Sequence, residues 1–253
     1  MDLVPDLGLV LHHVRQLYGA GLIPLPCCFP FSDGSCSGSR PKPRHRTVPC
    51  ARPGKTPLVA GFLDWGTSSP SYAYIANQIR RLFPVNVGLV VPPGLVVVEA
   101  DSLQAEQEVR ALGGAALDET PTRAPRLGRG PAWIFALPAG AYLRNRAHLG
   151  SSGAIDVRAP GHGILIAPPS RHTTGHEYSW IAGLAPWEVE PAPIPPPLLA
   201  LICAGAPRPR QQTVPSVSAA YADPLSRRVR ARIATRSDIR ARTRLDKIGR
   251  AHV

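Results

Sequence analysis

Two acidic residues separated by one position, Glu99 and Asp101, are the first candidates for chemistry in this sequence. They follow the apolar, β-branched run at 95–98, which predicts a strand, and side chains two positions apart on a strand point to the same face. Carboxylate oxygens are the ligands that hard cations such as Mg²⁺ and Mn²⁺ prefer. The pair therefore indicates a divalent metal site, although acids at this spacing also occur as solvated strand ends.

The cysteines of the N-terminal third form a second set of potential ligands. Cys36 and Cys50 enclose His45, and Cys27 or Cys28 lies upstream, so the segment offers four ligands of the types that zinc prefers. The spacing does not match a known pair of zinc knuckles, and reduced thiols in an irregular loop are the alternative. Cys36, His45 and Cys50 are therefore candidate Zn²⁺ ligands.

Lys55 lies in a Pro-Gly-Lys-Thr-Pro sequence at 53–57. It is not a Walker A lysine, because the first glycine of that motif and its following helix are absent. A contact from Lys55 to a nucleotide or to the backbone remains open.

Short helices and short strands must position these residues. Helical spacing of apolar residues predicts helices, and β-branched runs bounded by Pro and Gly predict strands. The expected helices are 9–18, 72–82, 104–112 and 198–202. The expected strands are 22–26, 85–91, 95–98, 133–137, 155–158, 164–167 and 178–181, with 155–158 and 164–167 forming a hairpin.

Several stretches, taken in order, carry a resemblance to a known family. They are DGSCS at 33–37, PGKTP at 53–57, GFLDW at 61–65, NVGL at 86–89, GLVVVEAD at 94–101, IDVR at 155–158 and APPSRH at 167–172. Together they resemble the bifunctional DNA primase/polymerase N-terminal family. The resemblance implies an α+β primase-polymerase fold, in which helices flank a mixed or antiparallel central sheet around a metal-binding cleft.

The resemblance also implies roles for particular residues. Asp156, which on its own would more often be a turn or salt-bridge acid, joins Glu99 and Asp101 as a ligand of Mg²⁺ or Mn²⁺. Two such ions activate a 3′-hydroxyl and neutralise the leaving pyrophosphate. The nucleotide contacts that the resemblance implies are Arg158, Ser170, Arg171 and His172.

Two positions depart from the family pattern. The family's acidic pair usually begins with Asp, and Glu99 is one methylene longer. The family's histidine, which contacts the incoming nucleotide, falls at Ala132, so its hydrogen bond is lost, at a cost of about 1.5–3 kcal/mol or about ten- to a hundredfold in affinity or rate. The candidate substitute donors are Arg129, Arg144, Arg146, Arg158, Arg171 and His172, of which Arg158 and Arg171 lie in matched stretches.

Composition indicates a globular chain with one catalytic-type domain, which we place at 9–202, followed by a basic tail at 203–253. The tail carries 12 Lys+Arg against 3 Asp+Glu, so most of the formal charge of +12 lies there and is weak evidence for nucleic-acid binding. The last residues, 247–253, match the translation of a common sequencing-library adapter. We therefore expect that these last residues are a sequencing artefact and that the natural tail is truncated here.

Five cysteines without an export signal, and the lack of a long apolar run, predict a cytoplasmic protein with no membrane partner. The leading hypothesis is a DNA primase/polymerase from the replication protein of a plasmid, phage or other mobile element. Its expected partners are a single-stranded DNA template, NTPs or dNTPs, and a helicase. The alternative is a catalytically reduced module of the same fold that binds nucleic acid or nucleotide in replication initiation, while a nuclease-like or other metal enzyme has no separate support.

Overall fold

The computed structural model describes residues 4–39, 49–161 and 163–204 of the chain. Its α-helices are α1 (Leu7–Gly19), α2 (Tyr72–Leu82), α3 (Leu103–Gly113) and α4 (Pro196–Cys203). Its 3₁₀ helices are η1 (Ser37–Ser39), η2 (Phe62–Gly66) and η3 (Gly114–Asp118). Its strands are β1 (Ile23–Cys28), β2 (Val85–Val90), β3 (Leu95–Ala100), β4 (Thr122–Arg123), β5 (Ala132–Ala136), β6 (Arg146–Leu149), β7 (Ile155–Arg158) and β8 (Ile164–Ala167).

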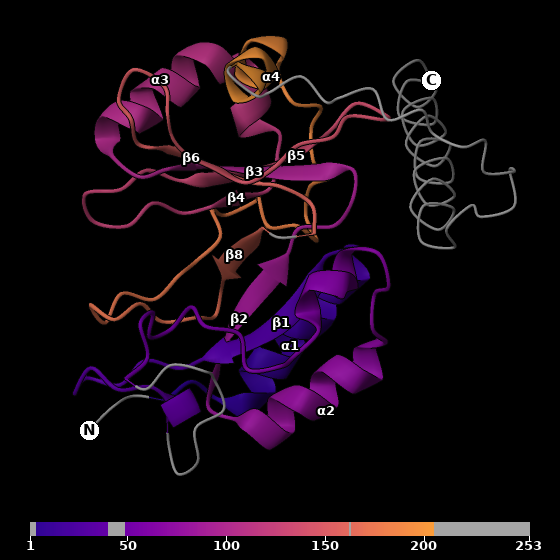
Figure 1. The fold of residues 1–253 in the computed structure, drawn as a ribbon, viewed down its shortest axis with the longest axis vertical. Helices are drawn as coiled ribbons and strands as arrows, with labels where there is room; N and C mark the ends of the chain where they lie inside the picture. The colour runs from indigo at the N-terminus through magenta and orange to yellow at the C-terminus, as the bar shows by residue number, and fades with distance from the viewer. Residues whose placement is uncertain (1–3, 40–48, 162, 205–253) are drawn as a thin grey trace, which may run out of the picture. The chain divides into compact units, whose positions relative to one another are not determined.

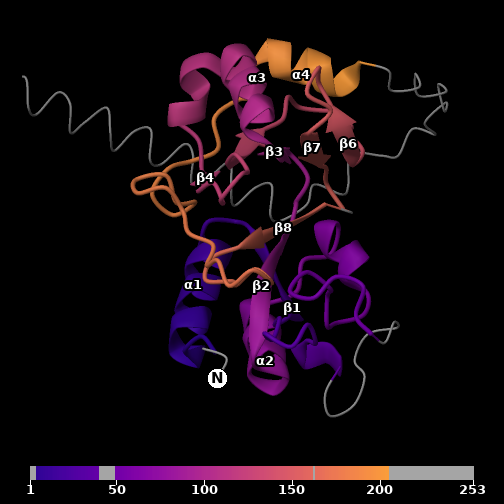
Figure 2. The same cartoon turned by 90° about the vertical axis from the view of Figure 1, so that its left-hand side faces the viewer.

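The strands form two sheets in which every pairing is antiparallel. The three-stranded sheet has the order β1-β2-β8, and the five-stranded sheet has the order β4-β5-β3-β7-β6. Helices α3 and α4 lie over one face of the five-stranded sheet, and α1 and α2 pack with the three-stranded sheet (Figures 1 and 2). The expected α+β class, with antiparallel sheets flanked by helices, is confirmed.

Alternation along β3 separates two hydrophobic clusters. Val96 and Val98 belong to the cluster that includes Val109 of α3 and Leu198 of α4. Val97 belongs to the other cluster, with Leu165 of β8. Because side chains alternate between the faces of a strand, residue 99 shares the face of Val97 and points toward the three-stranded sheet.

Local sequence explains where the helices begin. The side chains of Asp6, Ser71 and Ser102 each accept a hydrogen bond from a backbone N–H three residues later, as N-cap residues do. The Ser102 cap sets the start of α3 immediately after the acidic end of β3, so the chain turns away from the sheet directly behind Asp101.

The strand pairing differs from the sequence-based expectation in one important respect. The segments 155–158 and 164–167 are strands, but they do not form a hairpin, since β7 pairs with β3 and β6 whereas β8 pairs with β2. Backbone hydrogen bonds between Val91 and the turn at Gly161 and Gly163 bring the chain to the end of β2, so β8 joins the other sheet. The expected strand at 178–181 is also wrong, because only a single bridge joins Trp180 to Arg123.

Some expectations fall on parts of the chain that are not described. His45 and residues 205–253, which include nearly all of the predicted tail, lie outside the described residues. Among the helices of the described part, none combines the length and apolar character that a membrane span requires.

Candidate active site

A row of side chains crosses four strands of the five-stranded sheet and contains two of the predicted acids. Arg123 of β4 lies opposite Ala132 of β5, Ala132 lies opposite Glu99 of β3, and Glu99 lies opposite Asp156 of β7. Residues opposite one another in adjacent strands point to the same face. We call Arg123, Ala132, Glu99 and Asp156 the cross-sheet row, and this row faces the three-stranded sheet.

Arg123 reaches across Ala132 to Glu99. Its Nη2 lies 3.0 Å from Glu99 Oε1, and the two side chains are 6% and 12% exposed. Its Nη1 donates to the carbonyl oxygen of Ile166 in β8 at 3.0 Å, which fixes the guanidinium between the sheets. A histidine at position 132 would lie between the two partners. The small Ala132 side chain therefore leaves the space in which Arg123 reaches Glu99.

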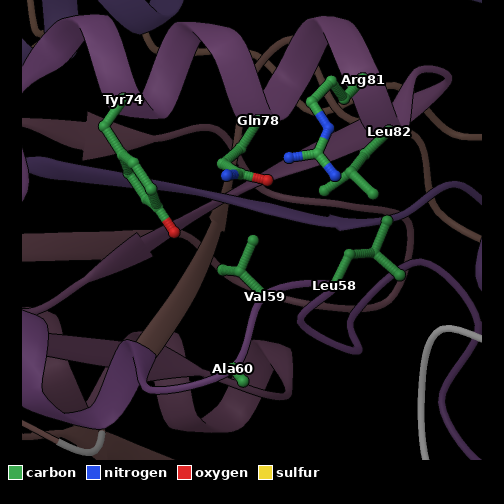
Figure 3. Close-up of a pocket in the computed structure, with 7 residues that line it drawn as sticks. All are labelled: Leu58, Val59, Ala60, Tyr74, Gln78, Arg81 and Leu82. Atoms are coloured by element: carbon green, nitrogen blue, oxygen red, sulfur yellow. The ribbon is translucent and has the colours of Figure 1, made fainter.

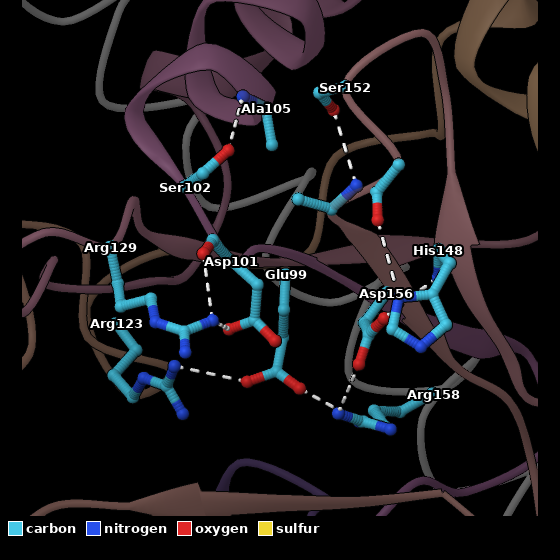
Figure 4. Close-up of polar contacts among 12 residues, drawn as sticks. Glu99, Asp101, Ser102, Ala105, Arg123, Arg129, His148, Ser152, Asp156 and Arg158 are labelled. Carbon is cyan, nitrogen blue, oxygen red and sulfur yellow. Dashed lines mark hydrogen bonds and ion pairs between the residues drawn. The ribbon is translucent and has the colours of Figure 1, made fainter.

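Arg158 bridges the two carboxylates of the row. Its Nε donates to Glu99 Oε2 at 2.8 Å and its Nη2 to Asp156 Oδ2 at 2.9 Å (Figure 4). Burial alone would raise the pKa of Glu99, but the positive charges of Arg123 and Arg158 lower it below its usual value. Glu99 is therefore ionised at neutral pH, with both oxygens accepting hydrogen bonds from guanidinium groups.

A bulge in β6 supplies a further donor to Asp156. The β6–β7 register shifts between Arg146 and Leu149, and His148 adopts a positive φ of 59°. In this conformation the backbone N–H of His148 donates to Asp156 Oδ1 at 3.2 Å. Both oxygens of Asp156 are thus engaged.

Asp101 lies just beyond β3 and is more exposed than the other two acids. Its Oδ1 is 3.2 Å from Arg129 Nη1, with side chains that are 35% and 46% exposed, and the same nitrogen donates to the Asp101 carbonyl oxygen at 2.7 Å. Each of the three predicted acids therefore has an arginine partner. In the described part of the chain, the one group of ligand atoms near enough to share an ion belongs to cysteines and not to these acids.

Further cationic side chains influence the same face. The pKa of Lys55 is lowered, first by its loss of hydration and then by Arg126, while Glu99 and Asp101 act in the opposite direction. The guanidinium groups of Arg123 and Arg126 lie 5.0 and 5.5 Å from the ring centre of Tyr178. Positive charge therefore gathers around the acidic end of β3.

His172 lies in this electrostatic environment. Loss of hydration, followed by the charges of Arg126 and Lys55, lowers its pKa to about 4. Its Nδ1 lies 3.0 Å from the hydroxyl oxygen of Thr174. His172 is therefore neutral at pH 7 and its pKa is sensitive to any anion that offsets the neighbouring cations.

Asn86 holds two of the candidate loops together at the start of β2. Its fully buried side chain donates to the carbonyl oxygens of Gly54 at 2.9 Å and Arg171 at 2.7 Å, and accepts from the Arg171 N–H at 3.0 Å. Gly54 has a φ of +83°, which favours glycine, and a Cβ there would lie 3.2 Å from Asn86 Nδ2. The loop that carries Lys55 and the loop that carries Arg171 are thus joined through one amide.

Two other predicted residues, Ser170 and Arg146, make backbone contacts in the structure. The buried Ser170 hydroxyl accepts from the Val87 N–H at 2.8 Å, a backbone contact that anchors the loop before Arg171. Arg146 donates to the Ile202 carbonyl oxygen at the end of α4, so it is not directed at the acids. Nucleotide contacts by Arg158, Ser170, Arg171 and His172 stay predictions.

Sequence reasoning missed Arg123. Its strand β4 has only two residues, Thr122 and Arg123, and so shows no alternation. The sequence offers only a charged residue next to a threonine, a residue type that favours strands, and this pattern is too common to identify a site.

The family comparison confirms the resemblance that the sequence carries. The family described as "Bifunctional DNA primase/polymerase, N-terminal" matches residues 41–197, which is more than half of the chain. The chain belongs to this family. Membership implies DNA primase/polymerase activity with DNA and nucleotides as substrates, and enzymes of the family use divalent metals. No curated protein matches this primase/polymerase chain significantly.

A separate hollow of the primase/polymerase domain, of about 620 Å³, lies beside α2 (Figure 3). It is lined by Leu58, Val59, Ala60, Tyr74, Gln78, Arg81 and Leu82. None of these residues belongs to the cross-sheet row, so this hollow does not extend the site. The expected metal-binding cleft stays a prediction.

Proposed function

We propose that this domain performs template-directed nucleotidyl transfer in the replication protein of a plasmid, phage or other mobile element. Its substrates are a single-stranded DNA template and NTPs or dNTPs, and a helicase is its expected partner. The observation that supports the proposal is the placement of Glu99 directly opposite Asp156 on neighbouring strands, with Asp101 two residues beyond Glu99.

The three acids offer the oxygen ligands that hard divalent cations prefer. Glu99 also carries the negative charge that binding such a cation requires. Carboxylates bind Mg²⁺ and Mn²⁺ in their ionised form, and the lowered pKa of Glu99 keeps that residue ionised. Glu99, Asp101 and Asp156 would hold the two ions, which supply activation of the 3′-hydroxyl and neutralisation of the leaving pyrophosphate. The three carboxylates can bind the ions only when the ion pairs with their arginine partners are broken.

Arg158 is the arginine partner that can be released from the carboxylates. Its side chain is 29% exposed, whereas Arg123 is 6% exposed and is tied to the Ile166 carbonyl oxygen. Release of Arg158 frees one oxygen of Glu99 and one of Asp156. The freed guanidinium is then available to pair with a phosphate, for which its planar fork of donors is well suited.

Arg123 extends its side chain over Ala132, the position of the missing histidine, from the neighbouring strand. It keeps a cation on this face at every physiological pH, because a guanidinium does not deprotonate. Together with Lys55 and Arg126 it favours a triphosphate electrostatically. These cations position the triphosphate, and neutral His172 remains able to donate a single hydrogen bond.

A second candidate function is favoured by a specific observation. Ala132 provides no side-chain donor, and both oxygens of Glu99 are held by arginines. If Arg158 does not leave, the domain binds nucleotide or nucleic acid through its cations without catalysing transfer. That alternative is the catalytically reduced module.

Mn²⁺ binding separates the two candidates. We expect electron paramagnetic resonance titrations with a non-hydrolysable dNTP to show Mn²⁺ bound by the wild-type chain and by Glu106→Gln, a matched acid-to-amide change in the partly buried pair that Glu106 forms with Arg110 within α3. Asp101→Asn should weaken this binding. In titrations without nucleotide, Arg158→Gln should strengthen Mn²⁺ binding, because the guanidinium that competes for Glu99 and Asp156 is gone. Equal Mn²⁺ binding by the wild type and Asp101→Asn would favour the reduced module.

A further inference from the structure

Three thiol groups converge at the end of β1, away from the cross-sheet row. The Sγ atoms of Cys28, Cys36 and Cys50 all lie within 4.8 Å of one another. The Sγ atoms of Cys28 and Cys50 are 4.0 Å apart, so no disulfide joins these two thiols. Cys28 and Cys36 are buried and Cys50 is half-buried.

Backbone hydrogen bonds bring these residues together from three segments. The chain after β1 folds back on itself, with a bridge between Pro30 and Cys36 and a hydrogen bond of 2.9 Å from the Ser37 N–H to the Phe29 carbonyl oxygen. The Cys28 N–H donates to the Thr56 carbonyl oxygen at 2.8 Å, which holds the segment after Cys50 beside β1. The convergence is therefore built by the fold and not by a short sequence motif.

The structure distinguishes Cys28 from its neighbour Cys27. Side chains of consecutive strand residues point to opposite faces. Cys27 packs over β2, where a Cβ added to Gly88 would lie 2.9 Å from its Sγ. Only Cys28 of the two is directed at Cys36 and Cys50.

We propose that Cys28, Cys36 and Cys50 bind a Zn²⁺ ion. In a tetrahedral zinc site with Zn–S bonds of about 2.3 Å, sulfur atoms are about 3.8 Å apart, close to the 4.0 Å between Cys28 and Cys50. Three soft thiolates favour zinc over Mg²⁺ or Mn²⁺, so this centre is chemically distinct from the carboxylates. Of the two upstream cysteines that the sequence offered, this ligand set contains Cys28, and His45 lies outside the described residues.

Thr56 lies next to the proposed centre. Its hydroxyl oxygen lies 3.4 Å from Cys50 Sγ, and the hydroxyl donates to the Arg52 carbonyl oxygen at 3.0 Å. Its carbonyl oxygen accepts from the Cys28 N–H, so Thr56 is tied to the segment that carries a ligand. Because Lys55 immediately precedes Thr56, the ion holds the loop that presents Lys55, and the importance of this for triphosphate binding rests on the proposed function.

The first test is the zinc content of the full chain, purified under reducing conditions without chelator. We expect about one Zn²⁺ per chain, lost in Cys36→Ser and in Cys50→Ser and retained in Cys50→His, which keeps a zinc ligand. Cys27→Ala and Cys203→Ser should retain zinc, and circular dichroism confirms that each variant is folded. X-ray absorption should show sulfur at about 2.3 Å from the zinc.

A tryptic readout tests the loop without any nucleotide. Cleavage after Lys55 should be slow in the zinc-loaded chain and faster after chelation, while cleavage after Arg80 in α2 serves as the internal control. Absence of zinc both as isolated and after reconstitution, a Cys28–Cys50 disulfide in the reduced preparation, or equal zinc loss in folded Cys27→Ala would overturn the proposal. Failure of nucleotide binding alone would count against the proposed function, since none of these measurements involves nucleotide.

Discussion

At the scale of single residues, the site is defined by how each charge is compensated. Glu99 is nearly buried and meets two guanidinium groups, whereas Asp101 meets one in a more exposed pair. A buried ion pair costs much when one partner is removed, because the other charge is left uncompensated. An exposed pair contributes little.

This contrast gives a stability prediction for matched substitutions of two arginines. Arg123→Met should lower the free energy of unfolding by up to about 3–5 kcal/mol, since it leaves Glu99 with Arg158 alone. Arg129→Met should lower it by no more than about 1 kcal/mol. Urea denaturation of both variants measures the difference, and equal effects would show that the Arg123–Glu99 pair is not the buried interaction described.

The protonation of His172 gives a second prediction at this scale. Its imidazole should titrate near a pKa of about 4, because loss of hydration and the charges of Arg126 and Lys55 disfavour the protonated form. The unfolded chain takes up this proton near pH 6.5, so the free energy of unfolding should fall as the pH drops from there toward 4.

NMR titration of the His172 ring, assigned with His172→Gln, measures this pKa directly. A nucleoside triphosphate should raise it by offsetting the two cations, whereas the corresponding nucleoside should not. A midpoint at the ordinary imidazole value, unaffected by the triphosphate, would refute the electrostatic description of this face.

At the scale of elements, β2 organises the loops around the site. Asn86 bonds both to Gly54, beside Lys55, and to Arg171, beside His172. Neither loop is held there by regular strand pairing, so the amide sets the spacing between them. Asn86 therefore joins the two loops directly, in addition to the separate contacts of Ser170 and Thr56 with β2 and β1.

Asn86→Ala should both destabilise the fold and weaken triphosphate binding. Loss of the amide leaves buried backbone groups of Gly54 and Arg171 without partners, at a cost of about 1–3 kcal/mol. Asn77→Ala, on the exposed face of α2, is the matched control and should leave both properties unchanged. Triphosphate affinity from calorimetry and thermal unfolding together provide the measurement, and unchanged affinity in folded Asn86→Ala would remove the positioning role.

Sequence patterns located most elements but not their partners. The helix expected at 72–82 has these bounds because an N-cap serine and one apolar face define it locally. The strands at 155–158 and 164–167 were also located, yet the hairpin between them was wrong, since β8 pairs with β2 across a large sequence separation. Local alternation carries no information on which distant strand is chosen.

At the scale of the whole molecule, the same limit explains which residues of each proposed metal site could be predicted from the sequence. Glu99, Asp101 and Asp156 were predicted because they lie in stretches with a family resemblance. Arg123, which pairs with Glu99, lies in a strand of two residues and required the sheet order to be known. Cys28 could not be chosen over Cys27, because only the register of β1 against β2 decides which thiol faces Cys36.

The two proposed metal centres differ in chemical character. The cysteines offer soft sulfur ligands at the end of β1, and the acids offer hard oxygen ligands at the end of β3. The loop at 49–58 contributes to both, since it contains the proposed zinc ligand Cys50 and the cationic Lys55. Zinc removal and loss of the carboxylates should therefore have separable effects.

Primer extension on a single-stranded template tests the central claim most directly. The comparison uses the wild-type chain, Asp101→Asn and the control Glu106→Gln, each with Mn²⁺ or Mg²⁺. Asp101 is preferred over Glu99 because its side chain is 35% exposed, so its loss is less disruptive to the fold. We expect extension by the wild type and Glu106→Gln that falls to background in Asp101→Asn; extension that survives in Asp101→Asn, or none by folded wild type that binds nucleotide, would show that these acids do not form a polymerase centre.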